Sequence, residues 1–249
     1  MMSSLRASNF RRIHVGLLLD LVLMFLFPAI IAALLFVVLK QLDMADFGAE
    51  GVTVAQLLAS PSPAVWAMYA LLTLQYCLAA LCALLVVSGL GELESESGEL
   101  RRAKRWFILL MAADGAVMLA HISDRLLSGS DAITPASTVY FAAVLLLFAF
   151  RFLALRALMR GYAEVLERVG ASEQALCALS LSRRIVAAIG LLMLVVISMF
   201  SLTLFDLVQP AKNAVRFGAA AAFGFYVVCR IQIVRFARAA TSLIGALSE

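Results

Sequence analysis

Residues 14–39 read HVGLLLDLVLMFLFPAIIAALLFVVL, a run that contains one aspartate and no lysine or arginine. A helix needs about 20 mainly apolar residues to cross a hydrocarbon core roughly 30 Å thick, because each residue advances it by about 1.5 Å. The run therefore predicts a membrane-spanning α-helix. It is too long for the apolar region of a cleaved signal peptide, which has about 7 to 15 residues.

Five further runs share this character: 63–90, 106–127, 135–157, 185–208 and 214–236. Of the 249 residues, 64% are hydrophobic and 14% are charged, whereas soluble domains have about 45–50% apolar and about 25% charged residues. Membrane β-strands are excluded, because they are short and alternate apolar with polar residues. We expect a single all-α domain, a polytopic membrane helix bundle of about six transmembrane helices.

Basic residues are distributed unevenly over the segments between the predicted spans. If the N-terminus is cytoplasmic, all but four of the 20 lysines and arginines fall on the cytoplasmic side; the exceptions are Lys40, Arg125, Lys212 and Arg216. Cytoplasmic loops carry an excess of these residues, so the pattern predicts both termini in the cytoplasm and the protein in the cytoplasmic (inner) membrane. We expect membrane lipids as partners rather than nucleic acid, because cations beside apolar spans face anionic headgroups.

The link 158–184 joins the fourth and fifth predicted spans on the cytoplasmic side. Apolar residues recur at near-helical spacing up to Val169, and Gly170 follows as a helix stop. We expect span four to continue into the cytoplasm, to break at Gly170, and to be followed by a second short helix from Ser172. Region 156–184 is the candidate surface for a cytoplasmic or membrane protein partner.

A weak internal similarity relates the second and third predicted hairpins. An offset of 79 residues superposes Arg151 on Arg230 and Arg156 on Arg235. One interpretation is a fold built from duplicated helical hairpins. The alternative is that every hairpin begins and ends at a basic membrane surface.

Ionisable residues inside the predicted spans are costly to place in lipid, so they are the first candidates for a functional site. Four of them are Asp20, Asp114, Arg151 and Arg230. At about 1.5 Å per residue, all four lie roughly 9 to 12 Å from the cytoplasmic ends of their spans. One hypothesis is that they form buried ion pairs that lock the helices or gate a path. The alternative is that the arginines extend to the cytoplasmic surface and the aspartates accept hydrogen bonds from neighbours.

Asp114 also begins the most polar helix face in the chain. His121 and Arg125 follow it at i+7 and i+11, which places them along one face, and Asp124 lies beside Arg125. Titratable groups in series suit a proton relay or a solute path. The alternative is that the last three residues mark the outer end of the span, which leaves only Asp114 buried.

Small residues recur four apart on the sixth predicted span, as Gly218 with Ala222 and Ala220 with Gly224. Such positions let two helices approach closely, so we expect this face to serve helix packing.

The sequence contains no pattern that indicates a cofactor, a metal site or a catalytic residue. His14 and His121 lie near opposite ends of their spans, so they cannot bind one haem together. A His-Glu-x-x-His motif is absent. We therefore expect a protein that is not an enzyme.

Two functions fit this pattern. A small transporter, or the membrane-embedded subunit of a transport complex, is favoured by the intramembrane charges, the proline at position 28 and the possible duplication. The alternative is a non-catalytic membrane accessory, immunity or scaffold protein that binds a partner, because no long soluble domain is present. The sequence makes no prediction of the oligomeric state.

Overall fold

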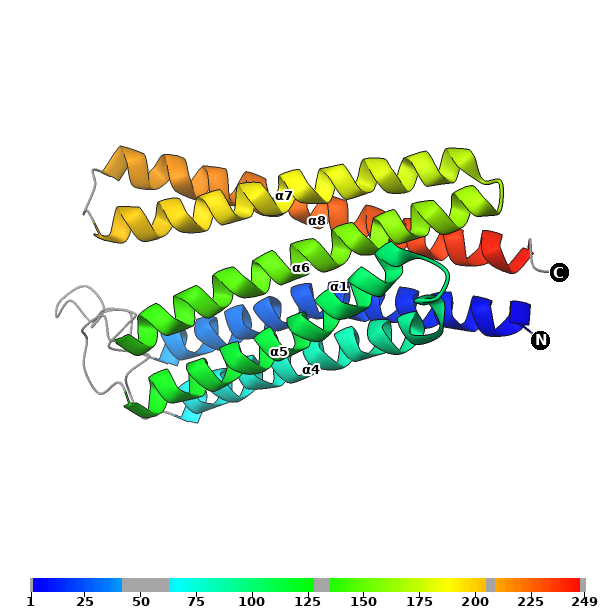
Figure 1. Cartoon of the computed structure of the whole chain (residues 1–249). Coiled ribbons are helices and arrows are strands. Elements are labelled where there is room, and N and C mark those ends of the chain that lie inside the picture. Colours follow the sequence, from blue (N-terminus) through cyan, green and yellow to red (C-terminus); the bar gives the residue numbers. More distant parts are fainter. Residues whose placement is uncertain (1, 42–62, 128–134, 205–208, 247–249) are drawn as a thin grey trace.

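The computed structural model describes residues 2–41, 63–127, 135–204 and 209–246 (Figure 1). These residues form six long helices and no strand. The helices are α1 (Met2–Gln41), α4 (Pro63–Leu93), α5 (Gly98–Leu127), α6 (Pro135–Arg168), α7 (Ser172–Leu204) and α8 (Gln209–Ala246). Each predicted span falls on a different helix, although the last four residues of the fifth span lie outside the described ranges.

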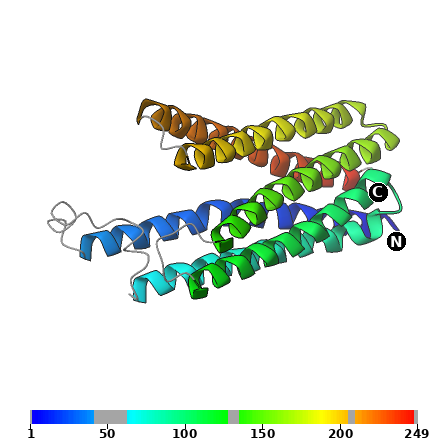
Figure 2. The ribbon, with the colours of Figure 1, turned by 60° about the vertical axis from the view of Figure 1, so that its left-hand side comes forward.

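The helices run up and down and pack as a closed ring. Each helix contacts the next one along the chain, and the first and last helices, α1 and α8, contact each other. Both termini lie at one end of the ring, together with the α4–α5 and α6–α7 connections (Figures 1 and 2). We call this the basic end, because most of the lysines and arginines between the spans belong to it.

Four helices contain a stretch that is long and apolar enough to cross a membrane. These stretches are Ala7–Leu34 in α1, Ala70–Leu93 in α4, Ser172–Val195 in α7 and Phe217–Ala246 in α8. Large apolar side chains such as Phe25, Leu194 and Phe217 face outward, where lipid solvates them better than water does. The prediction of an all-α membrane helix bundle is confirmed, and the protein is an integral membrane protein. That α5 and α6 also cross stays a prediction, because their described residues contain no such stretch.

The connection between α6 and α7 agrees with the predicted helix stop. Gly170 has a φ of 82°, a left-handed conformation that glycine adopts without steric cost. α7 then runs without a break from Ser172 to Leu204, so the short helix expected after the stop is the first part of a long one. The physical reason is that residues 172–189 contain neither glycine nor proline, so nothing interrupts the helix before it enters the bundle.

A close helix contact joins α1 and α4. A Cβ atom on Gly16 would lie 2.8 Å from the carbonyl oxygen of Cys82, and one on Gly89 would lie 2.6 Å from the carbonyl oxygen of Asn9. Only glycine permits this approach of the two backbones.

Gly218, Ala222 and Gly224 of α8 were expected to serve helix packing, but the two glycines have different surroundings from Gly16 and Gly89. Ala222 is buried, but Cβ atoms added to Gly218 or Gly224 would meet no atom within 4 Å. Their spacing allows a close approach, yet α8 turns these two glycines away from its neighbours. Among the described helices, Ala222 of this face is thus buried in the bundle, whereas Gly218 and Gly224 make no close approach to a neighbour.

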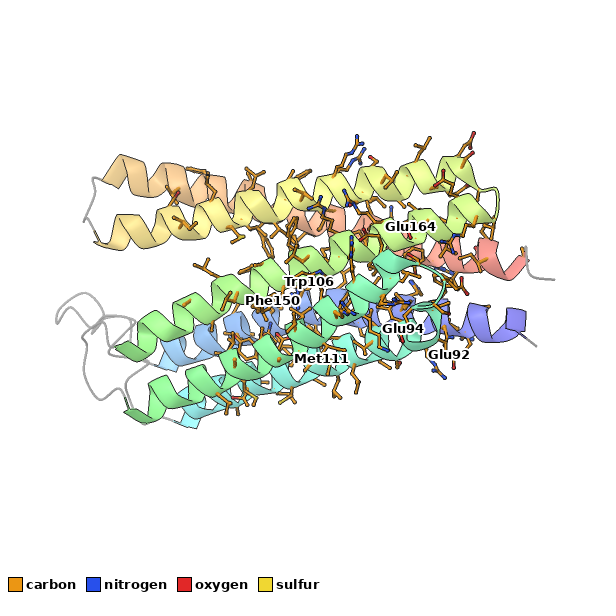
Figure 3. All side chains as sticks on the ribbon, viewed as in Figure 1. Glu92, Glu94, Trp106, Met111, Phe150 and Glu164 are labelled. Carbon is orange, nitrogen blue, oxygen red and sulfur yellow. The ribbon has the colours of Figure 1, made fainter. Side chains whose placement is uncertain are left out.

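Polar contacts join the helices near the basic end: Asn9 with Glu92, Lys104 with Glu94, and Ser97 with Glu164 (Figure 3). Ser97 also caps α5, because its hydroxyl oxygen accepts hydrogen bonds from the backbone N–H groups of residues 99 and 100 at 3.1 and 3.2 Å. The 94–97 connection is thus an ordered cap that fixes α4, α5 and α6 relative to one another.

Candidate functional site

An ion cluster joins three helices across the interior of the ring. Arg151 of α6 donates a hydrogen bond to Oδ1 of Asp20 on α1 at 3.2 Å, and Arg230 of α8 donates one to Oδ2 of the same carboxylate. We call Asp20, Arg151 and Arg230 the central cluster. It links α1 directly to α6, although the two helices lie on opposite sides of the ring.

The central cluster is shielded from solvent. The side chain of Arg230 is 2% exposed, and the side chains of Asp20 and Arg151 are 18% exposed. A charge buried in a medium of low dielectric constant is costly unless it is paired. Because one carboxylate serves two guanidinium groups, the three residues together carry an excess positive charge.

Asp114 of α5 supplies a further charge beside the cluster. It is buried, its Oδ2 atom has no hydrogen-bond partner, and it interacts electrostatically with Arg151 and Asp20. The structure thus brings together the four charged residues that the sequence places at one depth. Both arginines pair with Asp20, whereas no ion pair joins Asp114 to another described residue. If Asp114 is ionised, the two acids balance the two bases.

A small cavity borders the central cluster on the side of α4 and α5. Its volume is about 10 Å³, and Asp20, Arg151, Cys82 and Phe107 are among its lining residues. A cavity of roughly this size holds about one water molecule when polar groups line it.

An aromatic layer separates the central cluster from the basic end. The ring of Tyr162 on α6 lies 5.1 Å from that of Phe10 on α1 and 5.8 Å from that of Phe236 on α8, measured between ring centroids. The layer therefore joins the same three helices as the cluster. Burial raises the pKa of the Tyr162 hydroxyl, so the layer is uncharged. Sequence reasoning missed it, because its three residues are far apart in the chain and each fits an ordinary apolar helix face.

No protein-family model matches this chain, and no curated protein or solved structure is significantly similar to it. Functional inference therefore rests on the chemistry of its own residues.

The predicted path beyond Asp114 lies at the edge of what the structure describes. His121, Asp124 and Arg125 belong to α5, which continues to Leu127, but their side chains are outside the described part of the chain. Their role in a proton or solute path stays a prediction.

A second and larger hollow lies between α5 and α6 near the basic end. Its volume is about 180 Å³. We call it the basic groove and define it by Glu99, Arg102, Trp106, Leu153, Arg156 and Arg160. The groove opens on the outside of the ring, whereas the central cluster faces inward.

Proposed function

We propose that the protein is a small membrane transporter, acting alone or as a subunit of a transport complex, and that a small anionic solute binds at the central cluster. The observation that carries this proposal is the convergence of Arg151 and Arg230, from two different helices, on the carboxylate of Asp20. Paired guanidinium groups hold carboxylates and phosphates through charge-assisted hydrogen bonds. Without solute, the carboxylate of Asp20 would occupy the anion site between the two guanidinium groups. A solute anion would bind there by displacing this carboxylate.

Asp114 gives this transporter a way to couple the anion to a proton. With both aspartates ionised, the four charged groups sum to zero. Protonation of Asp114 leaves one positive charge in excess, and entry of a monovalent anion neutralises it. Buried acids that change charge in this way are common in proton-coupled transporters.

The aromatic layer fits the role of a gate in this proposal. Phe10, Tyr162 and Phe236 close the interior between the central cluster and the basic end. The excess of arginine at this end supports its placement in the cytoplasm of a cell with an inner membrane. The gate would then face the cytoplasm and would have to open for solute to leave. Neither this function nor the alternative below includes a chemical reaction.

Cys82 provides a test that does not require the solute to be known, because it lines the cavity beside Asp20 and is buried. The variant would keep this cysteine alone, through Cys77→Ser, Cys177→Ser and Cys229→Ser. In vesicles, a membrane-impermeant thiol reagent should label Cys82 slowly in the wild-type background and several-fold faster after Tyr162→Ala. Complete resistance to labelling in both backgrounds, with full labelling after denaturation, would count against a transport path.

Two matched variants control this experiment. A chain that keeps only Cys177, which is exposed on α7, reports the maximum labelling rate. A chain without any cysteine gives the background. Acetate, which is monovalent, and inorganic phosphate, whose monovalent form is present at neutral pH, are suitable first solutes. Either should slow the labelling of Cys82 if it binds beside Asp20.

A non-catalytic accessory protein is the second candidate, and it is favoured by the relative size of the two hollows. The cavity beside the central cluster has about 10 Å³, whereas the basic groove on the surface has about 180 Å³. In this function the cluster only locks α1, α6 and α8 together, and a partner binds along 156–184. The labelling experiment separates the two candidates, because a locked bundle protects Cys82 in every background.

A further inference from the structure

The basic groove carries an unbalanced positive charge. Arg102 of α5 is paired with Glu99 at 2.8 Å. Across the groove, Arg156 and Arg160 lie one turn apart on α6, and neither has a carboxylate partner among the residues that the structure describes. Two like charges at i and i+4 destabilise a helix. An anion bound between these two arginines would relieve their repulsion.

The shape of the groove is fixed by aromatic contacts. The guanidinium of Arg156 lies 6.0 Å from the centre of the Phe152 ring, a cation–π arrangement that holds the arginine against α6. The ring of Trp106 stacks on that of Phe150, with 6.0 Å between centroids, so it links the two walls (Figure 3). Aromatic side chains thus contact residues of both walls of the groove, α5 and α6.

Charge and apolar surface are separated along the groove. On α6, Arg160 lies nearer the basic end than Leu153. On α5, Trp106 lies deeper than Glu99 and Arg102, at the level where the predicted spans begin. At about 1.5 Å per residue, Arg160 and Leu153 are roughly 10 Å apart along α6. Phospholipids have the same polarity, because a charged headgroup adjoins an apolar chain. Tryptophan is also typical of the headgroup level, where its indole N–H has polar partners.

We propose that the basic groove binds one anionic phospholipid, with its phosphate against Arg156 and Arg160 and its acyl chain along Leu153 and Trp106. The volume of about 180 Å³ suits a headgroup rather than a whole lipid, so the chains continue into the bilayer. Basic pockets on the cytoplasmic side of membrane helices bind such headgroups. This site is independent of the central cluster and of the proposed transport function.

Trp106 is a natural reporter for this site. Because the chain has two tryptophans, the variant Trp66→Phe leaves Trp106 alone. The full-length protein would be reconstituted in phosphatidylcholine vesicles that contain either brominated phosphatidylglycerol or brominated phosphatidylcholine, since bromine quenches tryptophan on contact. At equal mole fractions, the anionic lipid should quench Trp106 much more strongly. The double change Arg156→Gln and Arg160→Gln should reduce this preference roughly 30-fold.

A second double variant is the matched control. Arg183→Gln and Arg184→Gln remove the same charge from exposed positions on α7, outside the groove, and should leave the preference intact. If the double groove variant does not fold, Arg160→Gln alone should lower the preference roughly fivefold. The proposal is overturned if both brominated lipids quench equally, or if the groove and control variants behave alike. It is also overturned if soluble inorganic phosphate removes the preference, because the site would then take a free anion.

Discussion

The central cluster and the basic groove both contain arginines of α6, but the surroundings of these arginines differ. Arg151, inside the ring, is held by the carboxylate of Asp20 at 3.2 Å. Arg156 and Arg160 lie five and nine residues further toward the basic end, about 1.4 and 2.5 helical turns. They face the outside without such a carboxylate partner among the described residues. A guanidinium in the interior must be paired, whereas one at the surface is solvated by water or a headgroup. The same residue type thus holds the fold together at one level and remains available to a ligand at the next.

The substitution Asp20→Asn should have the largest effect, because it removes the carboxylate that pairs with both interior guanidinium groups and leaves Asp114 as the only acid beside them. Breaking a buried ion pair by removing one partner costs about 3–5 kcal/mol. The measurement is the free energy of unfolding in detergent. Adding Arg230→Met should restore part of the loss, since Arg151 then remains as the one unpaired guanidinium of the cluster. An unchanged stability for Asp20→Asn would show that the interior tolerates unpaired arginine, and the contrast with the basic groove would fail.

Exchange of the paired charges examines the same contact more sharply. Asp20→Arg combined with Arg151→Asp keeps the charges but reverses their positions. Stability or transport lost in each single variant should return in the double variant if the two side chains depend on each other. The corresponding exchange of Asp114 and Arg230 should give no rescue, because these two residues do not form an ion pair.

Gly89→Ala should have an intermediate effect on stability, because the close contact between α1 and α4 leaves no space for a side chain at position 89. The added methyl group would lie 2.6 Å from the backbone oxygen of Asn9, so the two helices must move apart at a cost of about 1–3 kcal/mol. Gly190→Ala on α7 is the control, since its Cβ would meet no atom within 4 Å. Equal stabilities of the two variants, measured by thermal unfolding, would contradict the close α1–α4 contact.

Arg160→Gln should have the smallest effect on stability. Substitutions of exposed residues away from special features change the free energy of unfolding by less than about 0.5 kcal/mol. Thermal unfolding in detergent without added lipid gives the relevant value. A large loss under these conditions would mean that Arg160 holds the fold, and the proposed difference between interior and surface arginines would disappear.

Much of this fold follows from residue patterns along the chain. Apolar length predicts the helices, and the apolar run that ends before Gly170 predicts the stop that the structure has there. The rise per residue also places the four interior charges at one depth. Each of these properties depends on positions within one helix, so it can be derived from sequence alone.

The choice of partners could not be derived in this way. Helical periodicity says which residues share a face, but the rotation and neighbours of each helix depend on packing with the other five. For this reason the sequence alone does not show that Asp20 forms ion pairs with both Arg151 and Arg230, while Asp114 forms one with neither. The two arginines coincide at the 79-residue offset, yet Asp114 corresponds to Met193, so the two hairpins differ in the interior acid.

The contact between α1 and α8 has a consequence for biogenesis. Chains are synthesised and folded from the N-terminus, so α1 and Asp20 enter the membrane long before Arg230 is made. Arg151 arrives first and can pair with Asp20 while the ring is still open. The last helix then closes the bundle and completes the cluster in one step. A chain whose synthesis stopped before α8 would therefore leave exposed the face of α1 that α8 covers. Cellular quality control would recognise this exposed face as a sign of incomplete assembly.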